Sequence, residues 1–310
     1  MSPCLTVTGL TKRFGSLTAV DGISFSLNPG EILGFLGQNG AGKTTTIQML
    51  LGVMTPESGE IAYFGKNFAA YRTEILEEIN FSSAYTNLPN NLLVRDTLHY
   101  LSYFYRLPDR RARLAEIVAA FDLGRLLKQR ISTLSSGEQT RLNLAKAFFN
   151  RPKVLLLDEP TASLDPENAR FVRDYIDAER RRTGLAVLFT SHNMVEVEEV
   201  CDRVIFLHAG RITLDDTPLN LARKLDLSTV SLLIDPTDTG FSGLVAARGL
   251  AIERSGPEVS LRMPETEVPQ FIQALVGHNV RYHGLTVRRA GLEEYFFQNK
   301  KSPSSGGPHA

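Results

Sequence analysis

The sequence has few cysteines, no net charge and no long apolar run. Its two cysteines, Cys4 and Cys201, are far apart and in no metal-ligand spacing, which indicates a reducing compartment and excludes a disulfide framework. Its 34 basic residues balance 34 acidic ones, so we expect no basic surface for nucleic acid. The longest apolar runs are of strand length, far below the roughly 20 residues of a membrane-spanning helix. We therefore expect a soluble, cytoplasmic protein that reaches a membrane only through a partner.

The 310 residues are enough for one large domain and a small one. Alternating polar and apolar residues predict strands at 5–8 and 23–27. The segment 11–15 between them has the composition of a polar turn, and it contains Phe14. An aromatic residue near a turn is as typical of packing as of stacking on a nucleotide base, so Phe14 alone does not decide between the two.

The most informative stretch is the glycine-rich segment 37–45, which lies between a strand-like apolar run and a helix-like one. Gly37, Gly42, Lys43 and Thr44 have the G-x-x-x-x-G-K-[ST] spacing of a P-loop. Glycines allow backbone N–H groups to converge on an anion, and the N-terminus of the following helix adds partial positive charge. The sequence therefore predicts a phosphate-binding site, and the strand before it and the helix after it disfavour a chance glycine-rich turn.

The residue types within this loop suggest individual roles. The ammonium group of Lys43 would bridge the β- and γ-phosphates of a nucleotide, and the hydroxyl of Thr44 would bind Mg²⁺. The other candidates for binding the nucleotide are Gly37, Asn39, Gly40, Gly42 and Thr45.

Two further polar groups follow apolar runs typical of buried parallel strands. Asp158 and Glu159 follow the run 154–157, and adjacent carboxylates there are costly unless they meet a cation or hydrogen-bond donors. Asp158 could hold Mg²⁺ through water and Glu159 could activate the attacking water, although a solvated acidic turn is the alternative. His192 follows the run 186–189, at the edge where open α/β sheets bind ligands, but a lone histidine is often structural.

The segment 134–138, Leu-Ser-Ser-Gly-Glu, precedes a predicted helix at 139–149. Its serines and glycine could present N–H groups and hydroxyls to an anion, but this pattern alone favours an ordinary helix N-cap.

The rest of the chain divides into helical and mixed parts. Residues 87–150, with helices expected at 94–106 and 110–121, form a helical subdomain between strands. After residue 227 the order β-α-β-β-α-β predicts a small ferredoxin-like α+β domain over 228–298. The tail 299–310 is rich in Ser, Gly and Pro and is expected to be disordered.

Taken in order, these motifs resemble the nucleotide-binding subunit of an ABC (ATP-binding cassette) transporter over residues 5–225. The P-loop matches the Walker A motif, and 134–138 matches the family's signature motif, which usually has the sequence LSGGQ. Residues 154–159 match Walker B with its catalytic glutamate, and 163–165 match the D-loop. His192 matches the switch histidine, and Phe14 lies where the family has an aromatic residue that stacks on adenine.

This resemblance implies an α/β P-loop NTPase (ABC ATPase) domain, over residues 1–227, with an inserted helical subdomain and a small C-terminal α+β domain. It also implies an ATP hydrolase with ATP and Mg²⁺ as cofactors, in which Asp158 and Thr44 hold the metal. Two copies would bind two ATP molecules head to tail, with Ser135 and Gly137 on the γ-phosphate held by the other copy. Glu159 would polarise the attacking water, and His192 would contact the γ-phosphate.

The resemblance further implies a partner, an integral-membrane permease encoded separately, which holds the homodimer on the cytoplasmic face of the cell membrane. The Thr-Thr-Thr run after Lys43 and the segments 93–98 and 292–296 are similar to the branch that exports drugs, polysaccharides and antibiotics. The transported substrate cannot be inferred, because selectivity belongs to the permease.

Two residues depart from the family pattern. Ala84 lies where the family has a glutamine that senses Mg²⁺ and the γ-phosphate, so either Thr86 or Asn87 replaces it or coupling to the permease is altered. Ser136 lies where the signature motif has its first glycine, a small change that slightly crowds the backbone. Ala84 keeps open one alternative function, a regulatory module that binds ATP with weak hydrolysis, against which the retained Glu159 and His192 argue. A soluble ABC ATPase without a transport role is the other alternative.

Overall fold

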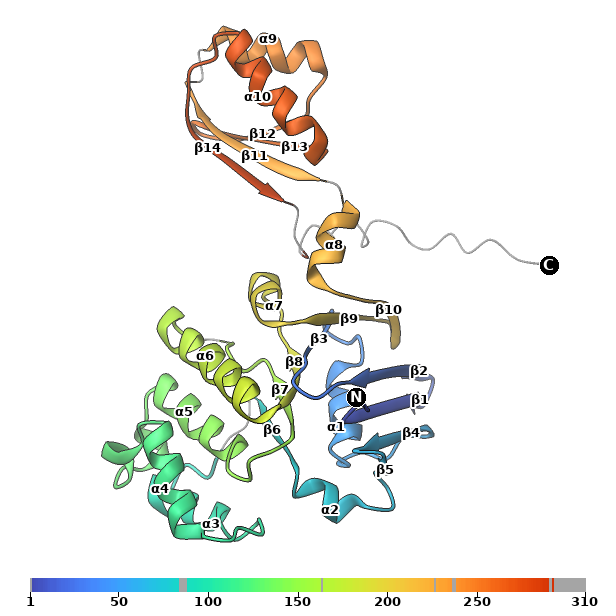
Figure 1. Ribbon diagram of the computed structural model, residues 1–310, viewed down its shortest axis with the longest axis vertical. Coiled ribbons are helices and arrows are strands. Elements are labelled where there is room, and N and C mark those ends of the chain that lie inside the picture. The colour runs from blue at the N-terminus through green and yellow to red at the C-terminus, as the bar shows by residue number, and fades with distance from the viewer. Residues whose placement is uncertain are drawn as a thin grey trace, which may run out of the picture. The chain divides into compact units, whose positions relative to one another are not determined.

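The computed structural model describes residues 2–83, 88–162, 164–225, 227–235, 238–289 and 292. Ala84, Thr86, Asn87, Ser163 and the tail 299–310 therefore lie outside the described residues. The chain forms two compact units, residues 1–216 and 217–310 (Figure 1). This division falls after Asp216 and not after residue 227, because the first unit ends with the last strand of its central sheet.

The central sheet of the first unit has six strands in the order β10-β9-β3-β8-β7-β6. All neighbouring pairs are parallel except β9 with β10, which form a hairpin. The apolar runs in the sequence form these strands as predicted, and β7 and β8 are buried along almost their whole length, as expected of parallel strands covered on both faces. The strands are β3 (Ile32–Gly37), β6 (Ile79–Ser83), β7 (Val154–Asp158), β8 (Ala186–Thr190), β9 (Arg203–His208) and β10 (Arg211–Asp216).

A second sheet of four antiparallel strands has the order β2-β1-β4-β5. Helix α1 (Lys43–Leu50) lies between the two sheets in Figure 1, and its Ile47, Met49 and Leu50 belong to one core with residues from both. The strands are β1 (Leu5–Phe14), β2 (Leu17–Leu27), β4 (Ser58–Tyr63) and β5 (Lys66–Asn67).

The predicted turn at 11–15 is wrong, because residues 11–14 continue strand β1. Thr11 pairs with Ser58 of β4, and Phe14 pairs with Leu17 of β2. The polar side chains of this segment indicated a turn, but both neighbouring strands pair with its backbone.

The helical subdomain contains α3 (Val94–Leu101), α4 (Arg110–Ala120) and α5 (Ser136–Ala147), with two 3₁₀ turns between α4 and α5 at Gly124–Leu126 and Ile131–Thr133. Helix α3 ends at Leu101, earlier than predicted. The Ser102 hydroxyl donates to the carbonyl of His99 (2.6 Å), and Arg110 Nε donates to the carbonyl of Ser102 (3.1 Å). These bonds satisfy the helix end and turn the chain towards α4.

Arg113 of α4 is buried, and its guanidinium group reaches the C-terminus of α5. Its Nε donates to the carbonyl of Phe149 at 2.8 Å, its Nη2 donates to the carbonyl of Phe148, and its Nη1 lies 2.7 Å from Glu116. The last carbonyls of a helix lack intrahelical partners and favour a positive charge. One side chain therefore fixes α4 against the helix that begins with the signature motif.

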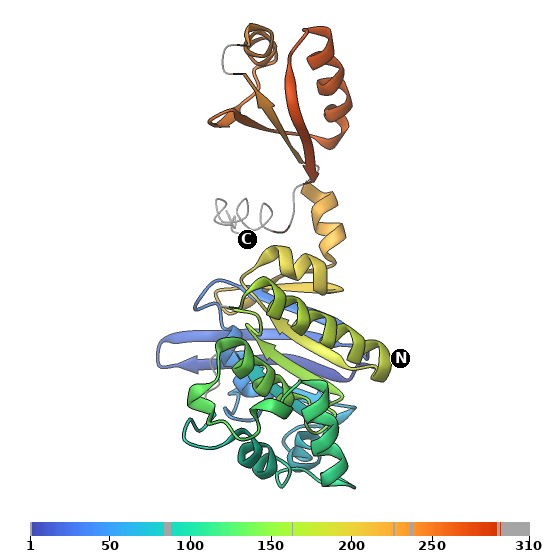
Figure 2. The same ribbon diagram turned by 90° about the vertical axis from the view of Figure 1, so that its left-hand side faces the viewer.

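Helix α6 (Pro166–Thr183) lies on the side of the central sheet opposite α1 (Figures 1 and 2). The shorter helices are α2 (Arg72–Leu76), which precedes β6, and α7 (Met194–Val200), which follows β8.

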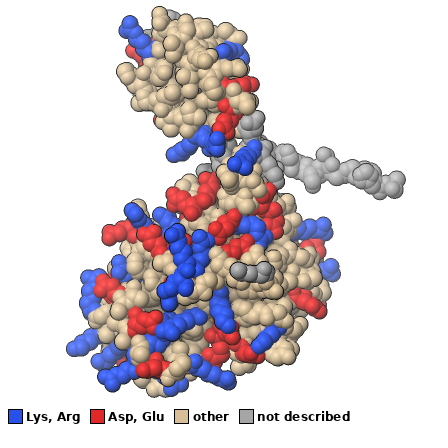
Figure 3. All heavy atoms as spheres, viewed as in Figure 1, with Lys and Arg blue, Asp and Glu red and all other residues tan. Residues whose placement is uncertain are grey.

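In the described part of the chain, none of the helices is both long and apolar enough to cross a bilayer. Figure 3 shows a face on which positive and negative side chains are interspersed over the first unit.

The second unit begins with α8 (Pro218–Leu225) and has the predicted β-α-β-β-α-β order. Its sheet has the strand order β12-β13-β11-β14, with antiparallel neighbours throughout. Apolar side chains of β11, β13, α9 and α10 form its own core, such as Val230, Leu261, Phe241 and Phe271. The elements are β11 (Ser228–Ile234), α9 (Thr239–Arg248), β12 (Ile252–Ser255), β13 (Glu258–Met263), α10 (Val268–Gly277) and β14 (Tyr282–Arg289).

Candidate nucleotide-binding and catalytic site

The P-loop connects β3 to α1, as predicted. Gly42 is the N-cap of α1 with a φ of 106°, a conformation that favours glycine, and a Cβ at this position would collide with the backbone oxygen of Ala19. Asn39, Gly40 and Thr44 are exposed on this loop and the first turn of α1. The backbone N–H groups at the start of α1 are therefore accessible to an anion.

Lys43 is the first residue of α1, and its side chain folds back over the loop. Its Nζ donates to the carbonyl of Gly37 at 2.6 Å and to that of Gln38 at 3.2 Å. Burial lowers the pKa of Lys43, while the negative charges of Glu159 and Asp158 oppose that shift. The structure thus brings the P-loop within electrostatic reach of the two carboxylates at the end of β7.

Asp158 and Glu159 are held by the neighbouring strand β8. The hydroxyl of Thr190 donates to Asp158 Oδ1 at 2.7 Å, and the backbone N–H of Glu159 donates to the carbonyl and the hydroxyl of Thr190, both at 3.1 Å. Glu159 has a φ of 53°, which is uncommon for a residue other than glycine. Backbone strain of this kind is often found at functional sites.

The carboxylate of Glu159 meets the ring of His192. His192 Nδ1 lies 2.6 Å from Glu159 Oε2, although the two residues belong to separate segments, which follow β8 and β7 respectively. The Glu159 side chain is only 16% exposed, whereas that of His192 is 76% exposed. A shielded carboxylate beside an accessible imidazole could orient a water molecule and contact a negatively charged group at the same time.

The signature segment forms a helix N-cap, the simpler of the two sequence interpretations. The Ser135 hydroxyl accepts from the N–H of Glu138 (3.3 Å), and Glu138 Oε2 accepts from the N–H of Ser135 (2.9 Å), which is a capping box. Ser135 is exposed, while Gly137 is buried, and a Cβ on Gly137 would lie 2.5 Å from Asn168 Nδ2. This cap leaves an exposed serine at the start of α5.

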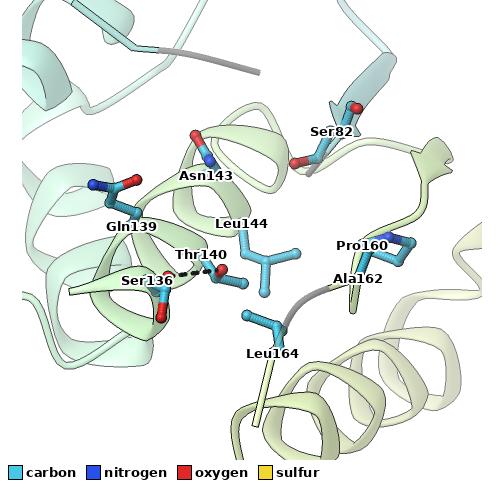
Figure 4. Close-up of a pocket in the computed structure, with 10 residues that line it drawn as sticks. Ser82, Ser136, Gln139, Thr140, Asn143, Leu144, Pro160, Ala162 and Leu164 are labelled. Carbon is cyan, nitrogen blue, oxygen red and sulfur yellow. Dashed lines mark hydrogen bonds between the residues drawn. The ribbon is translucent and has the colours of Figure 1, made fainter. Parts of the chain in front are cut away.

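The first turns of α5 line a separate cavity of about 130 Å³. Figure 4 shows Ser136 and Thr140 of α5 across from Leu164, and Ser82 at the end of β6. None of the P-loop residues lines this cavity, and no hydrogen bond or ion pair between described residues joins Ser135 or Gly137 to the P-loop. The structure brings together the P-loop, Asp158, Glu159 and His192, but not the signature segment.

Phe14 ends strand β1 with 47% of its surface exposed, and the Lys12 ammonium lies 5.7 Å from the centre of its ring. An exposed ring beside a cation suits both a base and its phosphates.

The arrangement fits a magnesium ion chemically. Among the described residues no group of three or more His, Cys, Asp or Glu could hold a metal. Mg²⁺ usually keeps several waters and takes only one or two protein oxygens beside those of phosphates. The exposed Thr44 hydroxyl and the Asp158 carboxylate, which Thr190 orients, are such oxygens.

Sequence reasoning missed several residues around this site. Thr190 orients Asp158, Asn168 packs against Gly137, and Glu196 accepts hydrogen bonds from the hydroxyls of two further residues, Thr161 and Ser191. The sequence marks Asn193 and Glu196 only as a helix N-terminus, because Asn-x-x-Glu is typical of one.

Comparison with known proteins identifies relatives of this chain. Residues 20–162 match the family model described as ABC transporter. The uncharacterized ABC transporter ATP-binding protein YhcH of Bacillus subtilis (strain 168) is 31% identical over 310 residues, covering 96% of each chain. The linearmycin resistance ATP-binding protein LnrL of the same strain is 30% identical over 298 residues, covering 93% of this chain and 95% of that protein.

A solved structure of an ATP-binding subunit of an ABC transporter is 25% identical, with a TM-score of 0.65, and covers 72% of this chain and 93% of that one. The predicted fold class, an ABC ATPase domain with a helical subdomain and a small α+β domain, is confirmed. The chain therefore belongs to the family of ABC transporter ATP-binding proteins, and it is an ATP hydrolase.

Proposed function

We propose that this protein forms a homodimer around two ATP molecules and couples Mg²⁺-dependent hydrolysis to export by a separate membrane permease. The observation that most supports the catalytic part is the 2.6 Å contact between Glu159 and His192 beside the P-loop. A carboxylate in that place can polarise the attacking water, and an imidazole can contact the γ-phosphate.

The remaining roles follow from the positions of the side chains. The backbone N–H groups of 37–45 and the Lys43 ammonium would bind the phosphates, and Phe14 would stack on the adenine. Thr44 and Asp158 would hold Mg²⁺, which neutralises charge on the phosphates when bound.

The head-to-tail dimer is supported by the separation of the signature segment from the P-loop within one copy. Ser135 is exposed at a helix N-terminus, and no hydrogen bond or ion pair between described residues joins it to the P-loop of its own chain. A second copy, related by a two-fold axis, would place its Ser135 and Gly137 on the γ-phosphate held here. ATP would then join two P-loops to two signature segments.

Export through a permease is supported by the likeness to LnrL, a resistance protein whose similarity extends over both units of this chain. The protein would then lie on the cytoplasmic face of the cell membrane, bound through the permease. The alternatives, a soluble ABC ATPase and a regulatory module with weak hydrolysis, rest on sequence alone, and Ala84 lies outside the described residues.

The test is a pull-down of the tagged protein from detergent-solubilised membranes of its native host, with partners identified by mass spectrometry. We expect a polytopic membrane protein in stoichiometric amount, and its type would narrow the class of substrate. Recovery of the ATPase only from the soluble fraction, with no membrane partner, would overturn the proposed coupling.

A further inference from the structure

Glu196 is a buried acid that the proposed roles above do not use. It lies on α7, with only 2% of its surface exposed. Its Oε2 accepts hydrogen bonds from the hydroxyls of Thr161, at 2.7 Å, and Ser191, at 2.9 Å. These hydroxyls belong to two different segments of the chain, the turn after Glu159 and the residue before His192.

The Thr161 side of this contact belongs to a compact turn. The N–H of Ala162 donates to the carbonyl of Glu159 at 3.1 Å, and the N–H of Leu164 donates to the carbonyl of Thr161 at 3.2 Å. The backbone around Thr161 is therefore fixed relative to Glu159. The Glu196 carboxylate holds this turn through the Thr161 hydroxyl.

The Ser191 side of the contact fixes the backbone that bears His192. The N–H of Asn193 donates to the Ser191 hydroxyl at 3.1 Å, and Asn193 Oδ1 accepts from the N–H of Glu196 at 3.3 Å. Ser191 and Asn193 thus tie both sides of His192 to the start of α7. One carboxylate joins the segment of Glu159 to the segment of His192.

The other oxygen of the Glu196 carboxylate destabilises the fold. Glu196 Oε1 is buried and has no hydrogen-bond partner among the described residues. A buried polar atom without a partner costs free energy, and a carboxylate costs more than a neutral amide. Glu196 also lines a cavity of about 380 Å³ together with His192 and Arg173. Stability alone does not account for a carboxylate at this position.

We propose that Glu196 is a positioning residue for ATP hydrolysis, which sets the distance between Glu159 and His192 through Thr161 and Ser191. Hydrogen bonds to an ionised acceptor are roughly twice as strong as neutral ones, so the carboxylate holds both hydroxyls more firmly than an amide would. Small errors in the position of catalytic groups are costly in rate. This inference depends on the proposed roles of Glu159 and His192.

The test compares Glu196→Gln with Glu199→Gln, an exposed acid on the same helix. For Glu196→Gln we expect kcat for Mg²⁺-dependent ATP hydrolysis to fall roughly tenfold, with KM for ATP within about twofold and the thermal midpoint unchanged or raised. The glutamine keeps the shape but weakens the hold on the two hydroxyls. Glu199→Gln should match the wild type in all three measurements.

Thr161→Val and Ser191→Ala each remove one hydroxyl and provide a second measurement if Glu196→Gln does not fold. We expect each to lower kcat, and either change combined with Glu196→Gln to lower it no further, because all act through one carboxylate. Wild-type kcat in both hydroxyl variants would overturn the inference. So would a loss of kcat in Glu196→Gln that matches its loss of folded protein.

Glu159→Gln, assayed in parallel, distinguishes a wrong inference about Glu196 from a wrong assignment of the catalytic site. If Glu159→Gln is inactive and Glu196→Gln has the wild-type kcat, only the inference about Glu196 fails. If Glu159→Gln retains the wild-type rate, the proposed catalytic site itself fails.

Discussion

His192 Nδ1 and Glu159 Oε2 lie 2.6 Å apart, although Glu159 precedes His192 by 33 positions in the sequence. The two residues lie just after β7 and β8, which are neighbours in the parallel sheet. Because Asp158 pairs with Thr190 in that register, the residues that follow each strand emerge at the same edge. The contact therefore depends on the strand order.

Glu159→Gln should lower the Mg²⁺-dependent ATPase rate at least roughly a hundredfold, the scale of a missing general base. Glutamine keeps the shape but cannot accept the proton of the attacking water. The steady-state rate of phosphate release measures this, with Glu57→Gln, an exposed acid on a turn, as the control. An unchanged rate would show that Glu159 is not catalytic.

Lys43→Ala should weaken ATP binding itself by at least about tenfold, because it removes a charge-assisted contact with the phosphates. Titration of a fluorescent ATP analogue measures the affinity. Lys66→Ala is the matched control, because Lys66 is a surface lysine paired with Glu74. Wild-type affinity in the Lys43 variant would contradict the P-loop assignment.

Gly137→Ala should lower ATPase activity, and a second substitution distinguishes two causes. One is the loss of the proposed contact with the γ-phosphate, and the other is disturbed packing against α6. The added Cβ would displace Asn168, whose Nδ2 donates to Asp165 Oδ2 at 2.7 Å. In Gly137→Ala combined with Asn168→Ala we expect the thermal midpoint to recover but the ATPase rate to remain low. A full return of activity would mean that Gly137 acts only through packing against α6.

Arg113→Met should lower the free energy of unfolding by about 3 kcal/mol, because it leaves the carbonyls of Phe148 and Phe149 without their charged donor. Urea denaturation measures this loss. Arg111→Met, on the exposed side of the same helix, should change stability by less than about 0.5 kcal/mol. Equal effects of the two changes would show that the contact with α5 adds nothing.

Ala84→Gln should preserve or raise the ATPase rate, because it restores the residue that the family has at this position. Ala70→Gln, at an exposed site, is the control. An inactive Ala84→Gln protein with normal stability would mean that this segment does not have the family's geometry.

The sequence alone determined the local elements of the site. The P-loop is continuous, and its glycines and the apolar runs around it predicted β3 and α1 without knowledge of any distant residue. The runs 154–157 and 186–189 likewise predicted β7 and β8, because strands buried on both faces need unbroken apolar residues. The turn at 11–15 failed, because strand pairing outweighed polar composition there.

Only the tertiary structure decided which side chains meet. The contacts of His192 with Glu159, of Glu196 with Thr161 and of Asn168 with Gly137 all join segments that are distant in the sequence. The sequence shows the residue types but not the strand register or the helix packing that bring them together. Those depend on how apolar faces from many segments are buried at once, and burial of this kind is a property of the whole fold.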